Sequence, residues 1–184
     1  LNCGVVGANP RSIEGPPDGN GSETFAVECA HVPIAFASDR GTDCYDESWG
    51  SYSPCFSLYV LGTAGVKRIL AGPDTVSYDQ PAWSPDGSRV LFTGESGDMR
   101  RIFGMDADGS NITQLTSVWA IDPAWSPDGT RIAFASGYRE AAHVYVMDAE
   151  GGDPTRLTDE GSVNAAPTWS PDGTRIAFVT NRDG

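Results

Sequence analysis

Pro123-Ala-Trp-Ser-Pro-Asp-Gly-Thr-Arg-Ile-Ala-Phe134 decides the fold of this chain, because nearly the same stretch occurs three times. The other two copies begin at Pro81 and at Pro167. The tryptophans that they share, Trp83, Trp125 and Trp169, lie 42 and then 44 residues apart. A period of about 40–45 residues that holds four short strands is the length of one β-propeller blade.

The Ser-Pro-Asp-Gly segment of each copy predicts a hairpin turn. Proline presets φ at the second position, aspartate hydrogen-bonds back to the backbone, and glycine takes the left-handed position. The strand expected over 131–136 carries large side chains on one face and small ones on the other, which suits burial between two stacked sheets. Since no segment has sustained helical spacing, the expected fold class is all-β. The turn residues concerned are Asp86, Gly87, Asp128, Gly129, Asp172 and Gly173.

Two further elements recur in step with this turn. Ile102-Phe-Gly-Met-Asp-Ala-Asp-Gly109 matches Val144-Tyr-Val-Met-Asp-Ala-Glu-Gly151, and Thr113-Gln-Leu-Thr116 matches Thr155-Arg-Leu-Thr158. Together with the Trp-Ser-Pro-Asp-Gly run, they strongly resemble the propeller repeats of TolB-type proteins. Related repeats occur in the non-catalytic propeller of prolyl oligopeptidase-type peptidases. The resemblance is close over about residues 80–184 and weak over 32–79.

The repeats divide the chain into an irregular N-terminal arm, residues 1–22, and a partial β-propeller, residues 23–184. The expected blades span about 23–79, 80–120, 121–164 and, incompletely, 165–184. Such a ring is open, with roughly three and a half four-stranded antiparallel blades. Closed rings have about 4–8 blades, and the resemblance to TolB-type proteins implies six blades. We therefore expect either a piece of a longer chain or a stack whose open faces another molecule covers. Head-to-tail stacking of copies would give an oligomer or an extracellular filament.

Four cysteines lie in the first third of the chain, at Cys3, Cys29, Cys44 and Cys55. None has the spacing of a zinc or redox site. The first blade carries a surplus segment, a loop expected over residues 39–56. The cysteine spacing favours a Cys44–Cys55 bridge across this loop and a Cys3–Cys29 bridge from the arm, with two other pairings open. Because disulfides form in oxidising compartments, we expect an extracytoplasmic location, in the periplasm, at the cell surface or secreted.

The acidic balance argues against two classes of partner. The chain has 25 acidic and 12 basic side chains, a formal net charge of −13. Nucleic acid and anionic lipid both need a basic face, and no apolar run approaches the roughly 20 residues that cross a bilayer. The sequence holds no G-x-S-x-G or H-E-x-x-H motif, and its two histidines, His31 and His143, fall in different blades. We therefore expect neither enzyme activity nor a cofactor.

Three groups of residues remain as candidate sites. Alternating oxygen ligands suggest a calcium site at Asp106, Asp108 and Asn111, although a hairpin turn explains them without an ion. The turn aspartates are expected to cap their own turns, and the three tryptophans to pack blade against blade. The aromatic residues of the surplus segment are expected either to anchor a partner or to form a small hydrophobic cluster; they are Tyr45, Trp49, Tyr52 and Phe56.

The sequence favours a non-catalytic module for protein–protein interaction or structural assembly. Propellers of the type that it resembles present loops and a central channel to protein partners. The expected partner is another protein or a second copy, with a homo-oligomer expected if the chain is complete. The alternative is the propeller portion of a prolyl oligopeptidase-type hydrolase whose catalytic domain lies outside this chain.

Overall fold

The structure is a computed structural model that describes residues 33–38, 43–46, 51–54, 56–62, 65–70, 76–96, 99–137, 142–159 and 163–181. These residues belong to one of two compact units of the chain, Pro33–Gly184. Every regular element in the described ranges is a β-strand, which confirms the all-β prediction. Within the same ranges, no helix has the length and apolarity to cross a membrane. The predicted arm, the Cys3–Cys29 bridge, Trp49 and Cys55 lie outside them.

The second and third sheets each have four antiparallel strands. The second has the order β6 (Val76–Trp83), β7 (Arg89–Ser96), β8 (Met99–Asp106), β9 (Thr113–Gln114). The third has the order β10 (Ala120–Trp125), β11 (Arg131–Ser136), β12 (His143–Asp148), β13 (Thr155–Arg156). Strand β6 begins at Val76, ahead of the blade boundary expected near residue 80. The strand continues through a register shift between Asp79 and Ala82.

The first and fourth sheets have fewer described strands. The first has the order β1 (Ile34–Ser38), β4 (Ser57–Gly62), β5 (Gly65–Leu70). The fourth pairs β14 (Asn164–Trp169) with β15 (Ile176–Thr180). A separate hairpin of β2 (Asp43–Asp46) and β3 (Ser51–Pro54) lies in the surplus segment, which the sequence predicted as a loop. Over the described residues the propeller is open, as expected.

The predicted hairpin turns are present in all three copies. In the third sheet, the Gly129 amide donates to the Ser126 carbonyl oxygen (2.9 Å), and Gly129 has a left-handed φ of 70°. The Ser126 hydroxyl oxygen accepts a hydrogen bond from the Arg131 amide (2.9 Å), which fixes the start of β11. Gly87 and Gly173 have φ values of 71° and 69°, so the three turns share one backbone conformation.

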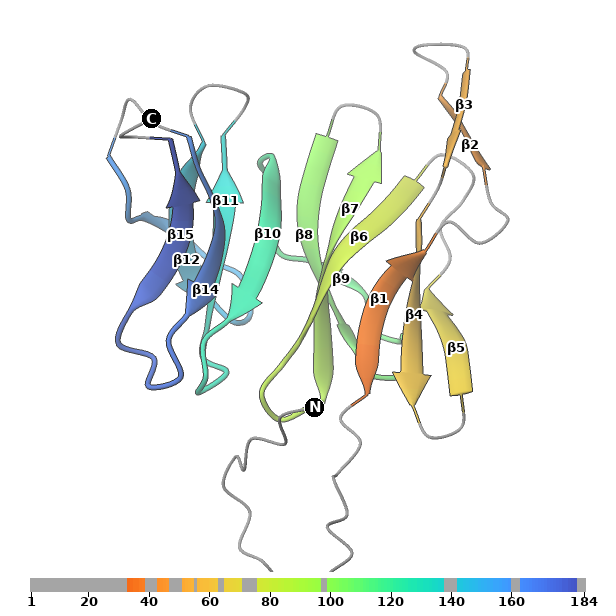
Figure 1. The fold of residues 1–184 in the computed structure, drawn as a ribbon, viewed down its shortest axis with the longest axis horizontal. Helices are drawn as coiled ribbons and strands as arrows, with labels where there is room; N and C mark the ends of the chain where they lie inside the picture. The colour runs from red at the N-terminus through yellow and green to blue at the C-terminus, as the bar shows by residue number, and fades with distance from the viewer. Residues whose placement is uncertain are drawn as a thin grey trace, which may run out of the picture. The chain divides into compact units, whose positions relative to one another are not determined.

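Figure 1 shows the four sheets following one another along the chain. Apolar side chains form the core between successive sheets. The core between the first and second sheets contains Leu58, Val90, Phe92 and Met105. The core between the second and third sheets contains Leu91, Ile102, Ala120, Ile132, Phe134 and Met147. Burying a side chain as large as leucine or phenylalanine contributes about 1.5–3 kcal/mol. The contacts between neighbouring sheets are therefore a main source of stability.

Candidate interaction surface

The three turn aspartates cap their own turns. Asp128 Oδ1 accepts hydrogen bonds from the Ser126 hydroxyl (2.6 Å), the Thr130 amide (3.0 Å) and the Thr130 hydroxyl (2.8 Å). These bonds favour the ionised carboxylate, so the pKa of Asp128 is lowered to about 2. The same kind of bonding lowers the pKa of Asp86 and Asp172 to about 2. Each carboxylate is thus engaged inside its own turn.

The residues proposed for calcium also form a hydrogen-bonded turn. Asp106 Oδ2 accepts from Asn111 Nδ2 (2.6 Å), and Asp108 Oδ1 accepts from the Ser110 amide (2.9 Å) and hydroxyl (2.6 Å). The Ser110 bonds lower the pKa of the Asp108 carboxyl. In the described part of the chain, no three His, Cys, Asp or Glu side chains are grouped as a metal site requires. A turn accounts for this arrangement, and the calcium site stays a prediction.

The residues proposed as an interaction loop are only partly described. Tyr45 on β2 and Tyr52 on β3 are register partners, and Phe56 is exposed. Cys44 lies opposite Ser53 in the same hairpin. Because Trp49 and Cys55 fall outside the described ranges, both the aromatic anchor and the Cys44–Cys55 bridge stay predictions.

Two of the three repeated tryptophans join neighbouring sheets. The indole N–H of Trp125 donates to the Ala82 carbonyl oxygen (3.3 Å), and that of Trp169 donates to the Ala124 carbonyl oxygen (3.2 Å). In each case the acceptor lies on the first strand of the preceding sheet. Nε1 of Trp83 is buried and has no hydrogen-bond partner among the residues that the structure describes.

The first strands of three sheets contain a repeated bulge that the sequence motifs do not predict. Gln80, Asp122 and Ala166 have left-handed φ values of 51°, 55° and 49°, each at a register shift of its strand. The Gln80 side chain accepts from the Asp122 amide (3.1 Å), and Asp122 Oδ2 accepts from the Ala166 amide (3.0 Å). These bonds link each sheet to the next. The spacing of 42 and 44 residues between Gln80, Asp122 and Ala166 was the only sign of this bulge in the sequence, because the three residue types differ.

One ion-pair group near this bulge was also missed. Arg100 Nη2 lies 3.2 Å from Asp79 Oδ2 and 2.5 Å from Glu95 Oε2. Burial is the largest cause that raises the pKa of Asp79, and the Arg100 charge opposes it. The three residues lie on β6, β7 and β8, so the group ties together strands of one sheet.

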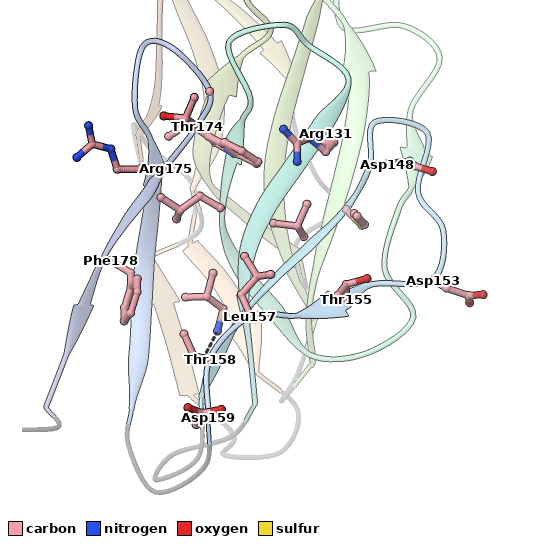
Figure 2. A pocket seen from close by; sticks show the side chains of 16 residues that line it. Arg131, Asp148, Asp153, Thr155, Leu157, Thr158, Asp159, Thr174, Arg175 and Phe178 are labelled. Atoms are coloured by element: carbon pink, nitrogen blue, oxygen red, sulfur yellow. Dashed lines mark hydrogen bonds between the residues drawn. The ribbon is translucent and has the colours of Figure 1, made fainter.

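A cavity of about 810 Å³ lies against the third and fourth sheets (Figure 2). We call its apolar wall the open face: Val144, Val146 and Leu157 from the third sheet, and Ile176 and Phe178 from β15. Arg131, Asp148, Asp153 and Arg175 also line the cavity. No histidine, cysteine or serine is among its described lining residues, so they lack the nucleophile–base pairs of serine and cysteine hydrolases.

The open face repeats a surface that is covered elsewhere in the chain. In the preceding sequence repeat, 42 residues earlier, the positions of Val144 and Leu157 are held by Ile102 and Leu115. Ile102 and Leu115 pack in the core against Phe134 and other residues of the third sheet. The cavity therefore lies where the outer strands of a neighbouring sheet would pack.

Comparison with known proteins agrees with this architecture. The family model of the TolB beta propeller domain matches residues 48–184. TolB from Acinetobacter baumannii has 20% identity and a TM-score of 0.64, over 83% of this chain and 37% of that one. A putative TolB from Agrobacterium tumefaciens has 22% identity and a TM-score of 0.57, over 80% and 58%. A puromycin-hydrolyzing peptidase from Mycobacterium tuberculosis has 21% identity and a TM-score of 0.55, over 70% and 23%.

At such identities, structural similarity establishes the fold alone, which is a β-propeller. The match of the family model goes further, because it covers most of the sequence: the chain belongs to the TolB β-propeller domain family. It spans less than two thirds of the length of each of these solved proteins. No curated protein matches it significantly.

Proposed function

We propose that this chain is a non-catalytic, extracytoplasmic propeller module that binds another protein through its open face. The composition of that face carries the proposal, since its residues are counterparts of residues that pack sheet against sheet elsewhere. Such a surface suits apolar contact with a folded polypeptide. Within it, Leu157 is 51% exposed and Phe178 is 39% exposed, and exposed apolar surface is typical of interaction sites. Family membership and the four cysteines support the extracytoplasmic location.

Selection of binders from a random β-hairpin library tests the proposed function. We expect selected hairpins to bind the full chain and to lose binding when Phe178 is changed to aspartate. Ile112→Asp is the matched control, because Ile112 is also an exposed apolar residue (49%) but does not line the cavity. A selection that yields no hairpin sensitive to Phe178→Asp contradicts the proposal.

The second candidate function is the propeller of a hydrolase, and the similarity to the M. tuberculosis peptidase favours it. A catalytic domain would then lie outside these residues. A serine-reactive fluorophosphonate probe separates the two candidates when it is applied to this chain and to the natural protein that contains it. We expect labelling of neither; labelling of the natural protein would favour the hydrolase.

A further inference from the structure

We propose that the outer edge of β5 pairs with an extended, acidic segment of a partner protein. This segment would add one strand to the first sheet, beside Lys67 and Arg68. The surface is separate from the open face, because no residue of β5 lines the cavity against the third and fourth sheets. The length, exposure and charge of β5 support this pairing, which is independent of the proposed function.

β5 is longer than the outermost strands of the second and third sheets. It has six residues, whereas β9 and β13 have two residues each. The three strands are counterparts, because each places one residue opposite an aromatic residue of the neighbouring strand; the pairs are Arg68–Tyr59, Gln114–Phe103 and Arg156–Tyr145. A very short edge strand protects a sheet from pairing with another chain, whereas a longer one is a template for it. The first sheet therefore has an edge that the second and third sheets lack.

The first four residues of β5, Gly65–Arg68, form a regular edge. They pair with β4 without a register shift, and all four are exposed. In an antiparallel pair, every second residue directs its N–H and C=O groups away from the partner strand. Among the residues that the structure describes, no backbone group hydrogen-bonds to this outer edge, and β5 is the outermost strand of its sheet (Figure 1). An incoming strand can therefore bond to these outward groups.

The other end of β5 is covered. Ile69 and Leu70 pack against the core between the first and second sheets, and the turn at Gly109 lies against the Ile69 carbonyl oxygen. In contrast, a Cβ added at Gly65 would have no atom within 4 Å. The available edge is thus limited to Gly65–Arg68.

The exposure of this edge does not depend on an open sheet face. The counterparts of Lys67 and Arg68 in the second sheet are Thr113 and Gln114. The second sheet has core contacts with a sheet on each side, and yet Thr113 and Gln114 are both exposed. These positions therefore stay accessible when a neighbouring sheet packs on the same face.

Two adjacent basic residues determine which partner suits the edge. Neither Lys67 nor Arg68 has an ion pair or a side-chain hydrogen bond to another residue in the described part of the chain. Opposite charges across a strand pair attract and like charges repel. The edge therefore favours Asp or Glu opposite both residues, and the same repulsion disfavours pairing with β5 of a second copy.

The acidic balance of the whole chain does not oppose this local preference. At physiological salt, exposed charges farther apart than about 8–10 Å are largely screened, so a strand beside β5 is influenced most by Lys67 and Arg68. Lys67 already acts on one carboxylate: after the hydrogen bonds from Ser110, its charge also lowers the pKa of Asp108. An acidic residue of the partner would be attracted in the same way.

A fluorescein-labelled peptide, Val-Thr-Glu-Glu-Val-Thr-Val, tests the inference with the full chain. Its β-branched residues favour the extended form, and we expect saturable binding by fluorescence anisotropy. The double change Lys67→Glu and Arg68→Glu should weaken binding by about tenfold, because two attractive cross-strand pairs become repulsive. A peptide with two lysines in place of the two glutamates should bind this variant better than it binds the unchanged chain. Arg156→Glu is the matched control on the two-residue strand β13 and should leave binding unchanged, as should Phe178→Asp on the open face.

Backbone methylation of the peptide separates strand pairing from charge attraction alone, and it leaves the chain unaltered. N-methylation at alternate residues blocks the donors on one edge of the peptide. Of the two complementary patterns, one should weaken binding by about tenfold or more, since it removes several hydrogen bonds, and the other should bind like the parent peptide. At saturating peptide, amide hydrogen exchange should slow within Gly65–Arg68 and stay unchanged in β9.

Four results would overturn the inference. They are absence of saturable binding, an equal response to both methylation patterns, equal weakening by Arg156→Glu and by the double change on β5, and unchanged amide exchange within Gly65–Arg68. Because Phe178 is not part of this edge, failure of this peptide to bind would leave the proposed function of the open face untouched.

Discussion

Strands β11 and β15 both contain the run Ile-Ala-Phe directly after an arginine, and they meet different surroundings. The turns before them are equivalent: the Arg131 amide donates to Ser126 Oγ at 2.9 Å, and the Arg175 amide donates to Ser170 Oγ at 3.0 Å. Yet Phe134 is completely buried, whereas Phe178 is 39% exposed. Local sequence accounts for the turn and the strand, and the neighbouring strands account for the burial.

This difference marks where the proposed interaction surface lies. β11 lies between β10 and β12 and packs in the core between the second and third sheets. β15 pairs only with β14 among the described strands. An identical sequence can therefore form core in one sheet and open surface in the next. Each of the following predictions compares two equivalent or comparable residues, so that its outcome can contradict or refine this explanation.

The largest difference is expected between Phe134→Ala and Phe178→Ala. Removing a fully buried phenylalanine leaves a cavity and should lower the free energy of unfolding by about 3–5 kcal/mol. The same change at the exposed position should cost about 1 kcal/mol or less, because less apolar surface is lost. Urea denaturation of the two variants measures both values. Equal costs would mean that β15 is covered in solution.

The next pair compares a turn packed on a neighbouring sheet with a turn in open space. Gly109 has φ +93°, and a Cβ there would overlap the Ile69 carbonyl oxygen. Gly87 has φ +71°, and nothing lies near its Cβ position. Gly109→Ala should therefore lower the free energy of unfolding by about 3 kcal/mol. Gly87→Ala should lower it by about 1 kcal/mol, because alanine is strained in the left-handed backbone conformation. Thermal denaturation would contradict this explanation if Gly87→Ala were the more damaging change.

A smaller effect is expected from the repeated tryptophans. Trp125→Phe removes a hydrogen bond to Ala82, whereas Trp83→Phe removes a buried N–H group that lacks a partner. Both changes replace an indole ring with a smaller phenyl ring, so this effect is shared. Because only Trp125→Phe also removes a hydrogen bond, it should lower the free energy of unfolding by about 1 kcal/mol more than Trp83→Phe. The same urea titration measures the difference. If Trp83→Phe costs as much or more, then Trp83 Nε1 has an acceptor in solution.

The smallest effect concerns acid stability, and it should be alike in the two sheets. The lowered pKa of Asp128 and of Asp172, about 2, means that each ionised carboxylate stabilises the fold above the ordinary aspartate pKa of about 4. This stability is lost as the pH falls toward 2. Asp128→Asn and Asp172→Asn should each lower Tm at pH 5 and leave it nearly unchanged at pH 2. A loss at pH 2 as large as that at pH 5 would show that the carboxylate charge is not the cause.

The parts of the fold that depend on local sequence could be predicted. The Ser-Pro-Asp-Gly turns, the strands after them and the all-β class follow from motifs whose residues bond to one another. The β2–β3 hairpin was missed because its segment matches no repeat. The left-handed bulge at Gln80, Asp122 and Ala166 was missed because three different residue types adopt it, each held by a neighbouring sheet.

The sequence predicted that an open sheet face would exist, but not which residues form it. Counting blades indicated open faces, but Leu157 gave no sign that it forms part of one, because Leu115 has the same character in a closed interface. Whether such a residue is exposed depends on what packs against it, and that information lies in the tertiary structure.

Amide hydrogen exchange of β11 and β15, measured by NMR in the full chain, tests the central claim most directly. We predict that the β15 amides exchange much faster than those of β11 in the chain alone. A saturating hairpin selected from the β-hairpin library should raise the protection of β15 toward that of β11, and it should not do so in Phe178→Asp. Equal protection of the two strands in the chain alone, or unchanged exchange of β15 with the hairpin bound, would contradict the account.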